Sequence, residues 1–135
     1  MIDIGKQKRR FERSKRNIMM SIGNNGMRVF KSDNFDSQGF RDGGLTRWKP
    51  KKKSDGRKTL VGKTRKLRGT IGYVVRGREI WFRSLAEYAK VHNEGLRAGR
   101  GKGFVMPKRQ FIGKSATHDK MNHRSILKII KSIMG

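Results

Sequence analysis

The chain has no cysteine, few acidic residues and no long apolar run. The absence of cysteine from its 135 residues excludes disulfides and thiolate metal sites, and it fits a reducing compartment. No stretch approaches the roughly 20 apolar residues that a membrane-spanning helix needs. No apolar run follows the basic N-terminus, as it would in a signal peptide. We therefore expect a soluble, intracellular protein that does not contact membranes.

The shortage of acidic residues leaves a very large positive charge. Ten Asp and Glu residues stand against 35 Lys and Arg residues, for a formal net charge of +25. Such a charge repels itself within an isolated subunit and attracts polyanions or acidic protein surfaces. Only 33% of the residues are hydrophobic, so a chain of this length can bury only a small core. We expect one domain with arms, in which some segments pack only against partners.

Residues 1–35 are predicted to form an N-terminal amphipathic helical arm. Apolar residues recur there at spacings of seven, seven, four and seven, which places them on one stripe of a helix: Ile4, Phe11, Ile18, Ile22 and Val29. The sequence GNNG at 23–26 consists of poor helix formers that together cost about 3 kcal/mol relative to alanine. We therefore expect a kink or two helices there. Packing of this helix on its own domain is favoured over a position on a membrane surface.

Residues 36–58 are predicted to form a basic extended loop. Several glycines and Pro50 interrupt this segment, which also contains the cationic run Lys49–Lys53. Trp48 stands between charged residues. A tryptophan in such a place usually buries its ring against a neighbouring element, and we expect this here.

Residues 59–116 are predicted to form an α+β core around a β-hairpin. The segments 70–75 and 79–83 flank Gly77 and Arg78, which suit a two-residue turn. Antiparallel pairing across this turn sets side chains opposite each other on two faces. The expected pairs are Tyr73 with Phe82, Val75 with Ile80, Val74 with Trp81, and Arg76 with Glu79.

Three further elements are expected after the hairpin. Ser84 and Glu87 have the S-x-x-E spacing of a capping box, which predicts a helix with Leu85, Tyr88, Ala89 and His92 on one side that ends at Gly95. Residues 96–104 are rich in glycine and carry Arg97, Arg100 and Lys102, so we expect a mobile basic loop. Residues 105–112, around Pro107, are predicted to add an edge strand. Residues 117–135 are predicted to form a C-terminal helix, since Ile126, Ile130 and Ile133 follow helical spacing.

Enzymatic sites are poorly supported. His92, His118 and His123 could suggest a histidine–metal nuclease, but they lie in polar or glycine-rich sequence without a supporting motif. A histidine on the apolar face of its helix is better explained as a core or interface residue. Residues 99–103 lack both the preceding strand and the GK[ST] ending of a phosphate-binding loop. No serine or threonine has a visible base partner. We expect a protein that is not an enzyme and has no cofactor or metal.

Binding to nucleic acid is better supported by the sequence than an enzymatic site. Between Arg47 and Arg68 there are eleven Lys or Arg residues and one acid, Asp55. Their neutralisation of phosphates would release counterions and make binding steeply dependent on salt. No helix-turn-helix, zinc finger or aromatic RNA-binding stripe is present, so DNA contact would be blind to sequence. A basic face that is solvated, or matched to an acidic partner, is equally compatible. The candidate contacts with DNA or an acidic partner are Lys49, Lys51, Lys52, Lys53, Arg57, Lys58, Lys63, Arg65, Lys66, Arg97, Arg100 and Lys102.

Four segments, in order along the chain, carry a family resemblance. They are LTRWKPKKK around Trp48 and Pro50, LVGKTRKLRGTI with Thr64, Leu67 and Arg68, YAKVHNEG with Tyr88, Ala89, His92, Asn93 and Gly95, and MPKRQFIG with Pro107, Arg109 and Phe111. In this ordered set the chain resembles the phage virion morphogenesis proteins, which are tail-completion proteins of Mu-like contractile-tailed phages. The resemblance covers nearly the whole chain.

The resemblance implies a structural virion protein of a tailed bacteriophage or prophage. It implies an α+β fold with a long N-terminal helix, a small antiparallel sheet and a C-terminal helix. It further implies a homo-oligomeric ring, sixfold or twelvefold, at the head–tail junction, with other tail, neck or portal proteins as partners. Such a protein would be in the host cytoplasm during assembly, and packaged DNA would be a non-specific contact. A free, sequence-independent nucleic-acid-binding protein is the alternative.

One position departs from the family pattern. Arg65 stands where the family usually has a glycine after the threonine. If that glycine takes a positive φ, the turn here is either rebuilt or carries modest strain in a non-glycine residue. The Lys and Arg residues around it are expected to point outward, while Leu60, Val61, Leu67 and Ile71 lead into the hairpin.

Overall fold

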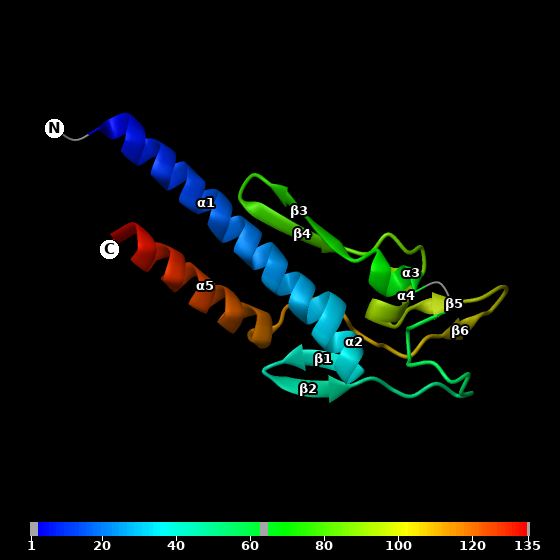
Figure 1. The fold of residues 1–135 in the computed structure, drawn as a ribbon. Helices are drawn as coiled ribbons and strands as arrows, with labels where there is room; N and C mark the ends of the chain where they lie inside the picture. The colour runs from blue at the N-terminus through cyan, green and yellow to red at the C-terminus, as the bar shows by residue number, and fades with distance from the viewer. Residues whose placement is uncertain (1–2, 63–64, 135) are drawn as a thin grey trace.

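The computed structural model describes residues 3–62 and 65–134, which form the expected α+β fold. Two long helices, α1 (Ile4–Gly26) and α5 (Ala116–Met134), lie side by side and bring both chain ends to one end of the molecule (Figure 1). The described residues contain three antiparallel hairpins: β1 (Gly39–Asp42) with β2 (Gly44–Arg47), β3 (Gly72–Arg76) with β4 (Glu79–Arg83), and β5 (Arg97–Ala98) with β6 (Phe104–Val105).

The long N-terminal helix continues without a break beyond the GNNG sequence. It passes from α1 through a π-helical segment, η1 (Met27–Asp33), into α2 (Asn34–Ser37), and it ends where Gln38 adopts a left-handed conformation with φ 54°. The expected kink at residues 23–26 is therefore wrong. A Cβ atom on Gly23 would overlap the ring of Tyr73, and one on Gly26 would overlap the ring of Phe82. The two glycines let the β3–β4 hairpin approach α1 closely, and this packing outweighs their low helix propensity.

The apolar stripe of this helix divides into two parts. Val29 is fully buried, and Ile18 and Ile22 are half-buried. Ile4 and Phe11, in contrast, are 76% and 57% exposed. The second half of the stripe packs on the subunit itself, as expected, while the first half leaves its apolar side chains in solvent.

The predicted C-terminal helix is confirmed as α5, which runs antiparallel to α1 (Figure 1). Asn25 on α1 donates from Nδ2 to Asn122 Oδ1 and to Ser125 Oγ, both at 3.1 Å. His118, at the start of α5, lies against the rings of Phe30 and Phe82. Polar and aromatic contacts thus fix α5 to α1 and to β4. We call α1 and α5 together the helical arm.

Two clusters of buried side chains form the core. The larger one contains Phe35, Trp48, Leu67, Ile71, Ala86, Ala89 and Phe111, and the smaller one contains Val29, Phe30 and Phe40. Trp48 is buried as predicted: its ring packs edge-on against Phe35 at 5.2 Å, and its Nε1 donates to the carbonyl of Gln110 at 2.7 Å. The segment 36–58, expected to be wholly loop, also contains the β1–β2 hairpin, which turns at Gly43 with φ 78°.

The β3–β4 hairpin has the predicted register at every pair. Tyr73 lies opposite Phe82, Val74 opposite Trp81, Val75 opposite Ile80, and Arg76 opposite Glu79. Gly77 takes φ 59° in the turn, as a two-residue connection of this kind requires.

The capping-box prediction is wrong. Helix α4 (Ala89–Glu94) begins five residues after Ser84. The Ser84 hydroxyl instead donates to the carbonyl of Leu67 at 3.0 Å and lies 3.0 Å from the hydroxyl of Thr70. These contacts hold Ser84 near the short helix α3 (Lys66–Gly69). Its hydroxyl also accepts from the backbone N–H of Ala86 at 3.3 Å, but no helix begins there. The expected end at Gly95 is confirmed, with φ 69°.

Two other elements differ from expectation. Residues 96–104 do not form a simple loop, because Arg97–Ala98 pairs with Phe104–Val105 across the glycine-rich turn. Residues 106–112 form no strand and instead follow an extended path around Pro107. Side chains from other elements bind the backbone of this segment, so no neighbouring strand is needed to satisfy its polar groups.

Candidate functional site

Residues 49–62 and 65–68, which carry most of the predicted cationic contacts, lie at the end of the molecule away from the free ends of α1 and α5 (Figure 1). In this segment Lys49, Lys52, Lys53, Arg57, Lys58, Arg65 and Lys66 are exposed, and Lys51 is half-buried. Lys63 and Thr64 lie outside the described residues. We call the described residues of 49–68 the basic face.

A pocket opens within the basic face. It has a volume of about 640 Å³ and is lined by Arg57, Lys58, Arg65 and Arg68, together with Gly56, Val61 and Gly62. In the described part of the chain, no acidic side chain lines it. We call it the basic pocket. Because like charges around one cavity repel each other, this arrangement favours an anion inside it.

Arg68 is turned further inward than the sequence indicated. Its Nε donates to the carbonyl of Lys31 at 2.8 Å, and its Nη2 lies 3.0 Å from the Asp36 carboxylate. Its guanidinium also lies 5.7 Å from the centre of the Phe35 ring. These contacts join the basic pocket to the end of the long helix and give Arg68 a structural role.

Arg65 adopts the conformation that the family glycine would favour. Its φ is 52° and its ψ is 27°, directly before α3. A non-glycine residue in this region costs about 1 kcal/mol or more. Arg65 therefore carries the strain considered from sequence, and its exposed side chain lines the basic pocket.

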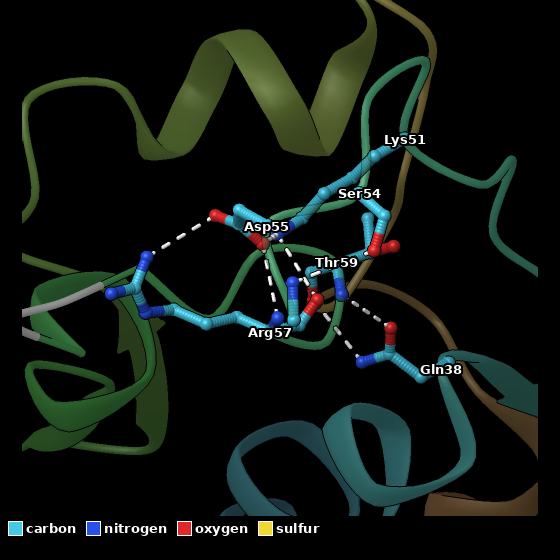
Figure 2. Close-up of polar contacts among 7 residues, drawn as sticks. Gln38, Lys51, Ser54, Asp55, Arg57 and Thr59 are labelled. Atoms are coloured by element: carbon cyan, nitrogen blue, oxygen red, sulfur yellow. Dashed lines mark hydrogen bonds and ion pairs between the residues drawn. The ribbon is translucent and has the colours of Figure 1, made fainter.

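The loop that carries most of the lysines is held by polar contacts (Figure 2). Lys51 donates to the Asp55 carboxylate at 2.7 Å and to the carbonyl of Arg57 at 3.1 Å. Asp55 also accepts from the backbone and the guanidinium of Arg57, at 3.0 and 3.3 Å. The Lys51 ammonium and the Arg57 backbone N–H lower the pKa of Asp55 from 3.8 to about 2, so this carboxylate stays charged at neutral pH.

Gln38 fastens the other end of this loop to the long helix. Its Oε1 accepts from the backbone N–H of Thr59 at 2.7 Å, and its Nε2 donates to the carbonyl of Thr59 at 3.1 Å. Figure 2 shows the Gln38 side chain pointing from the helix end toward Thr59. One side-chain amide thus satisfies both backbone groups of Thr59.

Arg109 binds the backbone at the start of this loop. It is 7% exposed, and it donates from Nε to the carbonyl of Lys49 at 2.7 Å and from Nη2 to that of Pro50 at 3.2 Å. Burial lowers the pKa of Arg109 below its usual value, although an arginine remains charged at physiological pH. Arg109 thus fixes the backbone from which Lys51–Lys53 project.

The residues that carry the family resemblance converge on this anchor. Trp48, Leu67, Ala89 and Phe111 belong to one buried cluster. Asn93 accepts at Oδ1 from the backbone N–H groups of Phe111 and Ile112, at 2.8 and 3.0 Å, and donates from Nδ2 to the carbonyl of Ile112 at 3.1 Å. Gly95 packs closely on the backbone of Lys108, where a side chain would clash. The motifs therefore build the scaffold beneath the basic face.

His92 lies in the same scaffold, next to Tyr88, whose ring it meets edge-on at 5.9 Å. Its Nδ1 is buried, and among the described residues it has no hydrogen-bond partner. Burial and the positive charge of Arg109 both lower the pKa of His92 from 6.5. His92 is therefore neutral at pH 7.

The structure does not bring the three histidines together. His92 lies beside Tyr88, while His118 packs against Phe30 and Phe82. In residues 3–62 and 65–134, no group of three His, Cys, Asp or Glu residues is placed to hold a metal ion. This arrangement gives no support to the histidine–metal nuclease.

Arg97, Arg100 and Lys102 lie on the exposed β5–β6 hairpin. Within its turn, Arg97 Nη1 donates to the carbonyl of Lys102 at 2.6 Å, and the backbone N–H of Gly103 donates to the carbonyl of Arg100 at 3.1 Å. No helix follows this turn, so it lacks the structure of a phosphate-binding loop.

Exposed apolar side chains are distributed differently from the cations. Between residues 49 and 68, none of the described large apolar side chains is exposed. Elsewhere many are: Ile4, Phe11, Met20, Leu127, Ile130 and Met134 on the helical arm, and Val75, Trp81, Leu85, Tyr88, Leu96, Phe104 and Val105 on the hairpins and their connections. Where such side chains form a contiguous patch, they are typical of surfaces that bind other proteins.

Sequence reasoning did not identify Gln38 or Asn34 as structural residues. Asn34 is fully buried and joins two distant segments, since it accepts from the backbone N–H of Arg41 and donates to the carbonyl of Phe111, both at 3.0 Å. Single buried amides leave no periodic pattern in a sequence, so no signal there could have identified them.

In the part of the chain that the structure describes, no helix has both the length and the apolar character needed to cross a bilayer.

Comparison with known proteins agrees with the resemblance seen in the sequence. The family model described as the phage virion morphogenesis family matches residues 5–133. Searches of curated proteins and of solved structures find no match. The family match covers nearly all of α1 and α5, the buried residues that carry the resemblance, and the basic face.

Proposed function

Because the chain belongs to the phage virion morphogenesis family, we propose that it is a structural component of the virion of a tailed bacteriophage or prophage, which completes the tail and joins it to the head. In this proposal, copies assemble in the host cytoplasm into a sixfold or twelvefold ring at the head–tail junction. Other tail, neck or portal proteins are its partners. Membership in this family supports a structural role over a catalytic one.

The observation that carries the ring proposal is the exposed apolar surface of the helical arm. Ile4 and Phe11 on α1 are 76% and 57% exposed, and Met134 at the end of α5 is 82% exposed. Ile4 and Phe11 continue the stripe of α1 that packs inside the subunit, and Met134 is an exposed apolar side chain on α5, so a neighbouring subunit can cover them in the same way. A contact between different surfaces of identical subunits generates a closed ring when its rotation closes.

The mass of the purified protein tests this proposal. Light scattering is expected to give a stable oligomer without nucleic acid, and Phe11→Ser is expected to shift it toward monomer. Lys90→Ser, an exposed position on α4, is the matched control and should leave the mass unchanged. A folded monomer at high protein concentration, together with the absence of the protein from assembled particles, would rule the proposal out.

The second candidate function is a free, sequence-independent nucleic-acid-binding protein. The basic face favours it, because its exposed cations are not interrupted by exposed apolar side chains. Light scattering with and without duplex DNA separates the two functions. A ring that forms without DNA supports the virion protein, whereas a monomer that assembles only on DNA supports the alternative.

A further inference from the structure

We propose that the basic pocket binds backbone phosphates of double-stranded DNA without reading the bases. The inference rests on the proposed virion role only in that the DNA would then be the packaged genome. The pocket itself is defined by Arg57, Lys58, Arg65 and Arg68 around a volume of about 640 Å³.

The basic pocket is lined by more cationic side chains than the nearby carboxylates can neutralise. Arg57 lies 3.3 Å from the Asp55 carboxylate, and Arg68 lies 3.0 Å from that of Asp36. Among the described residues, Lys58 and Arg65 have no carboxylate within ion-pair distance. Four cations against two carboxylates leave two charges that have no carboxylate partner among the described residues and are open to an external anion.

The kind of cation favours phosphate oxygens. Three of the four are arginines, whose planar guanidinium groups bind phosphate with two parallel hydrogen bonds. Arg65 is also held in a left-handed conformation, with φ 52°, that glycine would adopt without strain. Strained residues of this kind concentrate at binding sites, and Arg65 is one of the residues that line the pocket.

The surroundings favour DNA over an acidic protein. Protein interfaces have an apolar centre, but none of the described large apolar side chains between residues 49 and 68 is exposed. Exposed cations continue beyond the pocket, with Lys52 and Lys53 in the preceding loop and Lys66 in α3. A series of separate cations fits a polyanion with regularly spaced charges. The adjacent helix α3 has four residues, too few to enter a groove and read base edges.

The experiment measures binding of the full-length protein to random 20-base-pair duplexes by fluorescence anisotropy between 50 and 200 mM salt. The double variant Lys58→Gln/Arg65→Gln is expected to weaken binding on the order of tenfold per cation at 0.1 M salt, and to reduce the log–log salt slope by about 0.9 per lost phosphate contact. Changing the bases of the duplex should not change the affinity.

The control variant is Lys120→Gln/Arg124→Gln, which removes the same charge from exposed positions on α5. It should retain nearly the full salt slope. A second variant, Arg65→Gly, should weaken DNA binding while thermal unfolding shows equal or higher stability, which excludes misfolding as the cause.

Two results would overturn the inference. Equal loss of affinity in the α5 control would assign the binding to net charge alone. Saturable binding of polyglutamate without binding of DNA would assign the pocket to an acidic protein partner. The ring proposal is tested by mass without DNA, so a ring that does not bind DNA contradicts only this inference, and a DNA-binding monomer contradicts only the ring.

Discussion

The helical arm and the basic face differ in what holds them together. The arm is stabilised by close apolar and aromatic packing: the β3–β4 hairpin lies on Gly23 and Gly26 of α1, and Phe82 packs edge-on against His118 of α5 at 5.4 Å. In the loop of the basic face, residues 49–58, no side chain is fully buried. Its path is fixed by the side chains of Gln38 and Arg109, which bind its backbone at both ends.

This difference shows how a chain with a small core can present an ordered cationic surface. Burying lysine and arginine side chains costs free energy. A loop rich in them therefore cannot be shaped by the packing of its own side chains. Polar side chains from other elements, the half-buried Gln38 and the buried Arg109, shape it instead by satisfying backbone groups of the loop. The cationic side chains then remain free for contacts outside the subunit.

The largest expected effect concerns the arm. Gly26→Val places a side chain where the Phe82 ring lies, and it should lower the free energy of unfolding by about 3 kcal/mol, the upper end for overpacked cores. Gly69→Val is the matched control, because a Cβ atom at Gly69 meets nothing within 4 Å. Urea unfolding measures both. Equal stability of the two variants would contradict the close approach of the hairpin.

An intermediate effect is expected at the basic face. Gln38→Ala leaves the backbone N–H and carbonyl of Thr59 without their partner, which should cost about 1–2 kcal/mol. Hydrogen exchange at Thr59 and proteolysis after Lys51–Lys53 should both become faster, while exchange in the arm stays the same. The control is Ser54→Ala, since Ser54 accepts a single long bond of 3.4 Å from Gly56. Faster exchange in the arm as well would show that the two regions are not separable.

The smallest effect is the dependence of stability on pH through His92. Its pKa is lowered in the folded protein from 6.5, so below pH 6.5 the unfolded chain binds more protons than the folded one. Protonation of His92 should therefore lower the free energy of unfolding as the pH drops from 6.5 toward the folded-state pKa. Above pH 6.5, His92 should not change the stability with pH. In His92→Leu this component should disappear, as followed by thermal unfolding from pH 7 to pH 5. An unchanged pH profile in the variant would contradict the assignment.

Local patterns predicted some of the fold well. The β3–β4 register follows from a two-residue turn and side chains that alternate around it, and α5 follows from isoleucines at helical spacing. Other signals were overridden by contacts between distant segments. Propensity suggested a kink at Gly23 and Gly26, but the rings of Tyr73 and Phe82 require glycine there. At Ser84, where a cap was predicted, the hydroxyl contacts Leu67 and Thr70 of a distant segment, and the helix begins only at Ala89.

The candidate site was predictable in its charge and not in its shape. The exposed positions of Lys49, Lys52 and Lys53 follow from composition, because a cationic run of this length stays in solvent. The basic pocket depends on how Gly56–Gly62 approaches Arg65 and Arg68, and on the inward turn of Arg68 toward Asp36. A contact such as that between Arg68 and Asp36, which lie 32 residues apart, leaves no pattern in the local sequence.

The π-helical segment Met27–Asp33 sets the rotational phase between the two ends of the molecule. Each residue of an α-helix advances about 100° around its axis, and a π-helical turn holds one more residue than an α-helical turn. A π-helical residue therefore advances less around the axis than an α-helical one, and deleting a single residue from this segment would let it rewind as α-helix while α1 largely keeps its orientation relative to Asn34 and Phe35. Deleting one residue from α1 itself would instead rotate the part of the helix before it by about 100°, and with it the exposed side chains Ile4 and Phe11.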